Sequence, residues 1–221
     1  MGRFLLIILA LAMVAPVAQA GRKKAKAGEI KENVYTDAKY GFRLTLHENW
    51  KPRINDADDA ARLVLTQRNY AIPTKYKDAP DYTKIPRLVV YVDTTSMSAP
   101  VFIDSLISPD FKSKQKSAIL GEFEFLQEKE IAPKGKARIE LAGTTGFFWK
   151  GQSKYMKEIV ESVSATTGKR EYGNYGGAIY AVNRDQNIIL FHFMCEWEFY
   201  ETVMTEVESM IKSIEFIESE S

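Results

Sequence analysis

The chain offers few side chains for metal or redox chemistry, because it has two histidines and one cysteine. His192 and Cys195 suggest a metal pair by residue type. Residues three apart in a strand project to opposite faces, however, so this pair could not chelate one ion without a bulge. We therefore expect a buried His192 and no metal site. Phe191 and Phe193 alternate with Cys195 on one strand face, which favours a buried thiol over a disulfide between chains.

The remaining motifs do not predict catalysis. The acidic run from Asn55 to Asp59 has the oxygen density of a calcium loop, but it lacks the glycine and the distal glutamate that complete such a loop. Helix capping, within one helical turn, and solvation explain it better. Neither the G-x-S-x-G motif of serine hydrolases nor the phosphate-binding G-x-x-x-x-G-K-[ST] motif occurs. The glycines of residues 173–177 indicate a flexible turn. We expect no catalytic residues and no cofactor.

Tyrosine mixed with basic residues gives a better functional signal, in two stretches that look like loops. Residues 69–86 follow neither the helix nor the strand period, and residues 167–177 are rich in glycine and tyrosine. Tyrosine suits recognition because it offers a large, stiff contact face with a polar tip. The predicted partner-binding residues are Tyr70, Tyr76, Tyr82, Lys75, Lys77, Tyr172, Tyr175 and Arg170. The alternative is that these rings pack under their own loops.

The first twenty residues are typical of an export signal. Arg3 precedes the apolar run from Phe4 to Val14, Pro16 interrupts it, and residues 18–20 provide small side chains for cleavage after Ala20. The run of about eleven residues is shorter than the roughly 20 that a membrane-spanning helix needs. We therefore expect an exported bacterial protein, periplasmic or extracellular, with no transmembrane span after signal cleavage.

The mature chain is long enough for one domain, and its 45% hydrophobic and 12% aromatic composition argues against disorder. We assign residues 21–33 to a basic, flexible leader and residues 34–221 to a single domain. Removing Arg3 takes the formal charge from +1 to 0. Four basic residues lie together at the new N-terminus, at 22, 23, 24 and 26, so the remainder of the chain carries about four excess negative charges. That balance argues against nucleic-acid binding. The leader could still make weak contact with anionic lipid.

Hydrophobic periodicity predicts a mixed α/β domain. Residues 188–193 are apolar on both faces, which indicates a central strand covered from both sides. An amphipathic last helix is predicted by apolar residues at helical spacing, namely Phe199, Val203, Val207, Met210 and Ile211. Further helices are predicted at 100–107 and 109–120, and strands at 34–37, 41–47, 63–65, 88–92, 125–131, 137–141, 145–150, 178–182, 188–195 and 213–217.

Three short patterns resemble the PsbP-like superfamily. Tyr35-x-Asp37 leading into Tyr40-Gly41-Phe42-x-Leu44-x-Leu46 and Trp50 is similar to its opening. Residues 139–143 with Phe147-Phe148-Trp149 resemble its middle strand pair, and residues 210–216 resemble its closing helix-to-strand step. The chain departs from the family in residues 47–49, where a proline is common, and in the long insertion of residues 69–86.

The resemblance implies a single PsbP-like domain, an α/β/α sandwich in which a twisted, mainly antiparallel sheet has helices on both faces. Relatives include the extrinsic PsbP subunits of photosystem II, a Ran-binding Mog-type branch, DcrB-type envelope proteins and adaptor chaperones, which act mostly by binding. We therefore expect an exported, non-catalytic binding or accessory protein of the cell envelope that engages a protein or another envelope component. The alternatives are a chaperone-like adaptor that shields an apolar segment of an exported client, and a hydrolase.

Trp50 follows the alternating strand of Phe42 and Leu44. Its side chain could either contact a ligand or fill the hydrophobic core. In the proteins that the chain resembles, the aromatic residue at this place seals the sheet against its covering layer. A buried indole needs a partner for its N–H group, so we expect one here. The predicted core consists of Phe42, Leu44, Trp50, Phe191, Phe193, Cys195, Val203, Val207 and Ile211.

Overall fold

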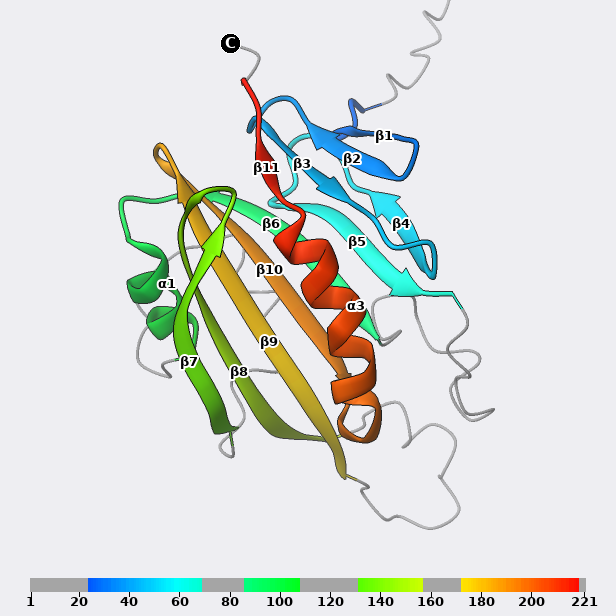
Figure 1. The fold of residues 1–221 in the computed structure, drawn as a ribbon, viewed down its shortest axis with the longest axis vertical. Coiled ribbons are helices and arrows are strands. Elements are labelled where there is room, and N and C mark those ends of the chain that lie inside the picture. Colours follow the sequence, from blue (N-terminus) through cyan, green and yellow to red (C-terminus); the bar gives the residue numbers. More distant parts are fainter. Residues whose placement is uncertain (1–23, 69–85, 108–130, 157–171, 219–221) are drawn as a thin grey trace, which may run out of the picture.

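The structure is a computed structural model that describes residues 24–68, 86–107, 131–156 and 172–218. These residues form two antiparallel β-sheets, two α-helices and one 3₁₀ turn (Figure 1). Among them no helix is both long enough and apolar enough to cross a membrane. The predicted helix at 109–120 and most of the predicted strand at 125–131 lie outside the described residues.

The large sheet has seven strands in the order β4-β5-β6-β10-β9-β8-β7. Every neighbouring pair is antiparallel. The strands are β4 (Trp50–Ile54), β5 (Ala61–Gln67), β6 (Arg87–Thr94), β7 (Ile131–Leu141), β8 (Thr144–Met156), β9 (Tyr172–Arg184) and β10 (Asn187–Glu196). The chain therefore forms most of this sheet by consecutive hairpins, with β6 joining the two halves through β10.

A small sheet of four strands, in the order β1-β2-β3-β11, stands beside the large one. Its strands are β1 (Glu29–Lys31), β2 (Val34–Asp37), β3 (Phe42–Thr45) and β11 (Glu215–Phe216). The helices are α1 (Ala99–Ile107) and α3 (Tyr200–Lys212), and the 3₁₀ turn η4 (Trp197–Phe199) leads into α3. Because β11 follows α3 and pairs with β3, the two ends of the domain meet in the small sheet.

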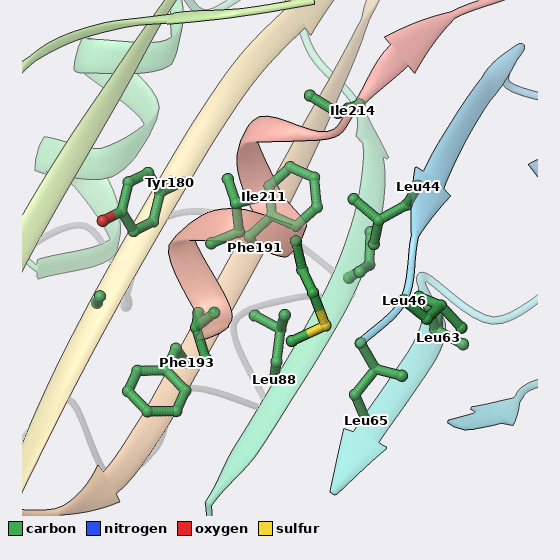
Figure 2. Close-up of a cluster of buried hydrophobic side chains, with 14 of the residues drawn as sticks. Leu44, Leu46, Leu63, Leu65, Leu88, Tyr180, Phe191, Phe193, Ile211 and Ile214 are labelled. Carbon is green, nitrogen blue, oxygen red and sulfur yellow. The ribbon is translucent and has the colours of Figure 1, made fainter. Parts of the chain in front are cut away.

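The main core lies between the large sheet, α3 and the small sheet. Figure 2 shows Leu65 and Leu88 of the large sheet, Leu44 of β3 and Ile211 of α3 around this core. Every residue of the predicted core belongs to this cluster, and each is at most 5% exposed. The apolar stripe of α3 therefore packs as its 3.6-residue period predicts.

The central strand β10 is buried on both faces, in agreement with its apolar sequence. Phe191 and Phe193 belong to the main core, whereas Ile188 and Leu190 belong to a second cluster that contains Phe102 of α1. Alternate side chains of a strand project to opposite faces. The second cluster therefore lies on the other face of the sheet, where α1 packs against β8 and β9.

The mixed α/β class is confirmed, whereas the described residues do not show a full sandwich with a helical layer over each face of the sheet. The described chain is mostly β-sheet, and α3 shares its side of the large sheet with the small sheet (Figure 1). The sheet is also larger than predicted, because β8 and β9 each run for thirteen residues. The two long strands extend the sheet well beyond the nine-residue helix α1 on its other face.

The leader is structured over its described residues, contrary to the predicted flexible tail. Residues 29–31 form β1, and Lys26 forms an isolated β-bridge with Asp56. Ala27 is buried, and its carbonyl accepts hydrogen bonds from the Tyr35 hydroxyl at 3.1 Å and from Arg62 at 3.2 Å. The acidic run from Asn55 to Asp59, for which a helical turn was considered, forms this bridge and a turn instead.

The sequence does not predict strand β4, because this segment lacks the apolar alternation of a strand. Trp50 was placed just after a strand, but it begins β4 and pairs with Gln67 of β5. Lys51 and Arg53 are exposed and Pro52 lies between them, a pattern with little apolar content. A strand at the edge of a sheet tolerates proline and charge, and β4 is such an edge.

Candidate partner-binding surface

The predicted partner-binding residues divide into two groups. Tyr70, Tyr76, Tyr82, Lys75, Lys77 and Arg170 lie outside the described residues. Tyr172 and Tyr175 belong to strand β9, so the assignment of their segment to a loop is wrong in this part. Tyr172 pairs with Met156 of β8, and Tyr175 pairs with Ser153 of β8 and Glu196 of β10. Both tyrosines therefore lie in register at one end of the large sheet.

That end of the sheet carries further aromatic residues, which sequence reasoning missed. The rings of Trp197 and Tyr200 stack with centroids 5.5 Å apart, and Tyr200 also contacts Phe193 at 5.7 Å. Phe199, which the helical spacing places on the buried face of the last helix, lies instead in η4 and is 42% exposed. We call Tyr172, Tyr175, Trp197, Phe199 and Tyr200, where β9, β10 and η4 meet, the aromatic end. Trp197, Phe199 and Tyr200 share a signal in the sequence, the pattern Trp-x-Phe-Tyr directly after a buried strand.

Glycines in β8 and β9 make room for large rings rather than for a flexible turn. A Cβ atom on Gly176 would lie 2.1 Å from the Tyr200 ring, and one on Gly151 would lie 2.2 Å from the Trp149 ring. The Tyr200 hydroxyl donates a hydrogen bond to the carbonyl of Gly177 at 3.3 Å. Gly151 pairs with Gly177 across the two strands, so these two glycines share one face of the sheet, whereas Gly176 lies on the other face with Tyr200.

A carboxylate on one flank of α3 holds Trp50. The Trp50 indole N–H donates to Glu206 Oε2 at 2.8 Å, and the Asn49 side-chain amide donates to Glu206 Oε1 at 3.1 Å. Gln67 adds a third, longer hydrogen bond at 3.4 Å. Burial acts to raise the pKa of Glu206, but these hydrogen bonds and His47 outweigh it and lower the pKa. Trp50 is 1% exposed, so the indole fills the core and its N–H is satisfied by the helix.

His47 lies close to this carboxylate, with its Nδ1 atom 3.9 Å from Glu206 Oε2. An acid beside a histidine is the arrangement that general acid–base chemistry uses. Here His47 Nδ1 accepts a hydrogen bond from the Asn49 backbone N–H at 3.2 Å, within the turn that leads to Trp50. Both side chains therefore contribute to the anchoring of that turn against α3.

The other flank of α3 is held by a second carboxylate, Glu208. It accepts hydrogen bonds from Lys150 of β8, from the Tyr180 hydroxyl at 2.9 Å and from Lys212 at 3.0 Å. Burial acts to raise the pKa of Glu208, but hydrogen bonds from Lys150, Lys212 and Tyr180 outweigh it and hold the pKa at about 2. Lys150 also lies over the rings of Phe148 and Tyr180.

This contact predicts an acid-sensitive contribution to stability. The pKa of Glu208 is about 2 in the folded chain and near its ordinary value of 4.5 in the unfolded chain. The contribution is therefore complete above about pH 4.5 and is lost as the pH falls towards about 2. We expect Glu208→Gln to lose about 1–2 kcal/mol at pH 7, and the difference from wild type to shrink between pH 4.5 and 2. Urea unfolding across this range measures it.

The exposed carboxylate Glu48 supplies the control, because Glu48→Gln should change the unfolding free energy by less than about 0.5 kcal/mol at every pH. A difference between Glu208→Gln and wild type that stays constant from pH 7 to pH 2 would show that the Glu208 carboxylate does not titrate as a clamped group.

A third polar cluster joins the two sheets and is fully buried. Arg62 of β5 is 1% exposed, and its Nε donates to Asp37 of β2 at 2.8 Å. The guanidinium also donates to the carbonyls of Ala57 at 2.6 Å, Asp59 at 3.1 Å and Ala27 at 3.2 Å. A buried charge pair is favourable only when its remaining donors and acceptors are satisfied, as they are at this arginine.

His192 and Cys195 are both buried, at 1% and 0% exposed. Cys195 belongs to the main core, whereas His192 pairs with Val89 and Ile179 of the second cluster. The two side chains thus face opposite sides of the sheet, as their spacing predicts. Burial lowers the pKa of His192 well below its ordinary value, and burial raises the pKa of the Cys195 thiol to about 12. A thiol held in its protonated form is a poor nucleophile.

Two shallow, open hollows of the described surface lie at the β7–β8 turn. One is lined by Arg138, Ile139, Glu140, Gly143, Thr144 and Thr145. The other extends towards the end of α3 and is lined by Glu140, Ala142, Gly143, Lys212, Ile214, Glu215 and Phe216. By strand register this turn lies at the opposite end of the sheet from the aromatic end. Within the described residues, no group of three or more His, Cys, Asp or Glu could hold a metal ion.

Comparison with known proteins gives likenesses of fold. No protein-family model matches the chain, and no curated protein matches it. The solution structure of cyanobacterial PsbP from Synechocystis sp. PCC 6803 is 10% identical, with a TM-score of 0.48 over 91% of this chain and 99% of that one. LpqN of Mycobacterium tuberculosis, described as involved in cell envelope biogenesis, is 9% identical, with a TM-score of 0.44 over 80% of this chain and 83% of that one.

Proposed function

We propose that this chain is an exported, non-catalytic accessory protein of the cell envelope that binds a protein partner through the aromatic end. The observation that carries the proposal is the gathering of Trp197, Phe199 and Tyr200 beside the strand that bears Tyr172 and Tyr175. Aromatic residues are enriched where proteins bind each other, because each ring buries much area with few rotatable bonds.

The exposed part of the aromatic end rests on a rigid base. Tyr200 is 2% exposed and packs against Trp197, Phe193 and Gly176, so it holds the turn in place and does not itself meet a partner. Phe199 projects at 42% exposure from the same turn, and a partner that covered it would bury apolar area. In the sequence, Lys169 and Arg170 lie three and two residues before Tyr172, the first residue of β9.

The polar clusters of the described residues support structural roles rather than catalysis. Glu206 and His47 are the pair closest to an acid–base arrangement, but Trp50, Asn49 and Gln67 donate to that carboxylate. The hollows at the opposite end carry charged residues, and such linings suit an apolar client segment poorly. A binding protein is therefore better supported than either a hydrolase or a chaperone-like adaptor.

Two exposed apolar residues allow a matched test. Phe199 and Val101 are the large hydrophobic residues that are clearly exposed in the described chain, at 42% and 52%, and they lie on different elements. We expect Phe199→Ala, and Tyr172→Ala with Tyr175→Ala, to reduce partner recovery from crosslinked cells at least fivefold. Val101→Ala should leave recovery unchanged, and thermal midpoints should confirm that the variants fold. Equal recovery for all variants would reject the aromatic end as the binding surface.

A further inference from the structure

Strand β7 forms an outer edge of the large sheet. Its hydrogen-bonded neighbour is β8, and the other side of the strand has no partner among the described residues. Lys136, Ala137, Arg138 and Glu140 are all exposed, which shows that this edge is open to solvent. An open edge presents a row of backbone N–H and C=O groups that can pair with another strand.

The two faces of β7 differ in chemistry. Ile139 and Leu141 point to the side of the main core, which they join together with Phe148 of β8. Arg138 and Glu140 alternate with them and therefore point to the side of α1. Lys136, on the same side as Arg138, forms an ion pair with Asp104 of α1. Arg138 and Glu140 form no ion pair with any described residue.

This pattern is complementary to itself in one antiparallel register. When two copies of β7 pair about a twofold axis at Ile139, Arg138 of each copy lies opposite Glu140 of the other. Opposite charges directly across an antiparallel pair are stabilising. On the other face, Ile139 meets its own copy and Ala137 meets Leu141. The alternative with the axis at Arg138 would place two arginines face to face, and like charges there are destabilising.

We propose that β7 is a self-association edge, at which a second copy of this chain adds its own β7 in the register centred on Ile139. A twofold axis gives both copies the same contact twice, which is the usual symmetry of a homodimer. The charges that would keep a foreign strand away from this edge thus become two ion pairs between copies.

The association should be weak. Pairing of the five residues from 137 to 141 buries less than the roughly 1,200 Å² at which specific, stable interfaces begin. We therefore expect a dissociation constant on the order of 10–100 µM, so that the chain is a monomer when dilute. Sedimentation velocity of the mature chain over a concentration series from about 1 to 500 µM covers this range.

Charge reversal tests both the edge and its register. With Arg138→Glu, each of the two cross-strand pairs consists of two carboxylates. With Glu140→Arg, each pair consists of two arginines. The dimer of either single variant should therefore have a dissociation constant at least tenfold higher than that of wild type. The double variant R138E/E140R restores opposite charges and should dimerise within about threefold of wild type. A mixture of the two single variants should form a heterodimer, because each then supplies the charges that the other lacks.

The outcomes separate clearly. Circular dichroism should show every variant folded, since both positions are exposed. Loss in the single variants with recovery in the double variant and in the mixture supports the proposal. Wild-type chain that stays monomeric at 500 µM, or single variants that dimerise like wild type, or a mixture that forms no heterodimer, overturns it. In the first case β7 is either a charge-protected edge or a site for a different strand. Phe199→Ala leaves this equilibrium unchanged, so the result is independent of the aromatic end.

Discussion

Replacing Trp50 with alanine should cost this protein about 3–5 kcal/mol of unfolding free energy, as truncation of large core aromatics does. Trp50 is 1% exposed, its ring meets Phe193 edge-on at 6.5 Å, and its N–H donates to Glu206 at 2.8 Å. The substitution leaves a cavity between the sheet and α3 and takes one hydrogen bond from Glu206. Urea unfolding followed by circular dichroism measures the loss.

A second variant separates packing from hydrogen bonding at this position. Trp50→Phe keeps most of the apolar contact and removes the indole N–H, so we expect it to lose about half as much as alanine. In Glu206→Gln the side-chain amide can still accept from Trp50, so this change should cost less than about 1.5 kcal/mol. A loss below about 1 kcal/mol for Trp50→Ala would mean that the ring is not part of the core.

The second large effect is expected at the buried pair of Arg62 and Asp37. Arg62→Ala leaves the Asp37 carboxylate, at 0% exposure, without its charged partner and removes the donors to three backbone carbonyls. Breaking one side of such a pair typically costs about 3–5 kcal/mol. Because Asp37 belongs to the small sheet and Arg62 to the large one, the loss should also loosen the two sheets from each other. Urea unfolding and hydrogen exchange of the small sheet measure both effects.

Two comparisons test this explanation. The exposed ion pair of Arg43 and Glu215 is a matched control, and Arg43→Ala should cost less than about 1 kcal/mol. The double variant Asp37→Leu with Arg62→Met replaces both charges by apolar groups and should be more stable than Arg62→Ala alone. If the double variant were less stable than both single ones, the cost would come from lost packing rather than from a stranded charge.

Local patterns predicted the core and the central elements. Three local patterns indicate which face is buried: the alternation at Phe42 and Leu44, the doubly apolar run of β10, and the helical spacing of Val203 and Val207. Such patterns depend on neighbours a few residues apart in sequence, so a single chain reveals them. The predicted position of α1 was also close, since Pro100 suits the first turn of a helix.

Contacts between distant segments could not be predicted in the same way. Trp50 and Glu206 are 156 residues apart, and no local sequence pattern around either residue indicates that they form a hydrogen bond. The glycines at 176 and 177 have the composition of a turn, yet they lie in a strand, and the Tyr200 ring occupies the space that a side chain at 176 would take. Strand β4 escaped because edge strands carry proline and charge. In each case tertiary packing overrides the local propensity.

Crosslinking at single positions in intact cells tests the central proposal most directly. A photoreactive amino acid would replace Phe199 of the aromatic end in one strain and Val101 of α1 in another, both of them exposed side chains. We predict a discrete crosslinked partner at position 199, absent at position 101 and diminished when Tyr172 and Tyr175 are alanine. Crosslinks of equal strength at both positions, or none at position 199 alongside a discrete product at 101, would contradict a partner-binding role for the aromatic end.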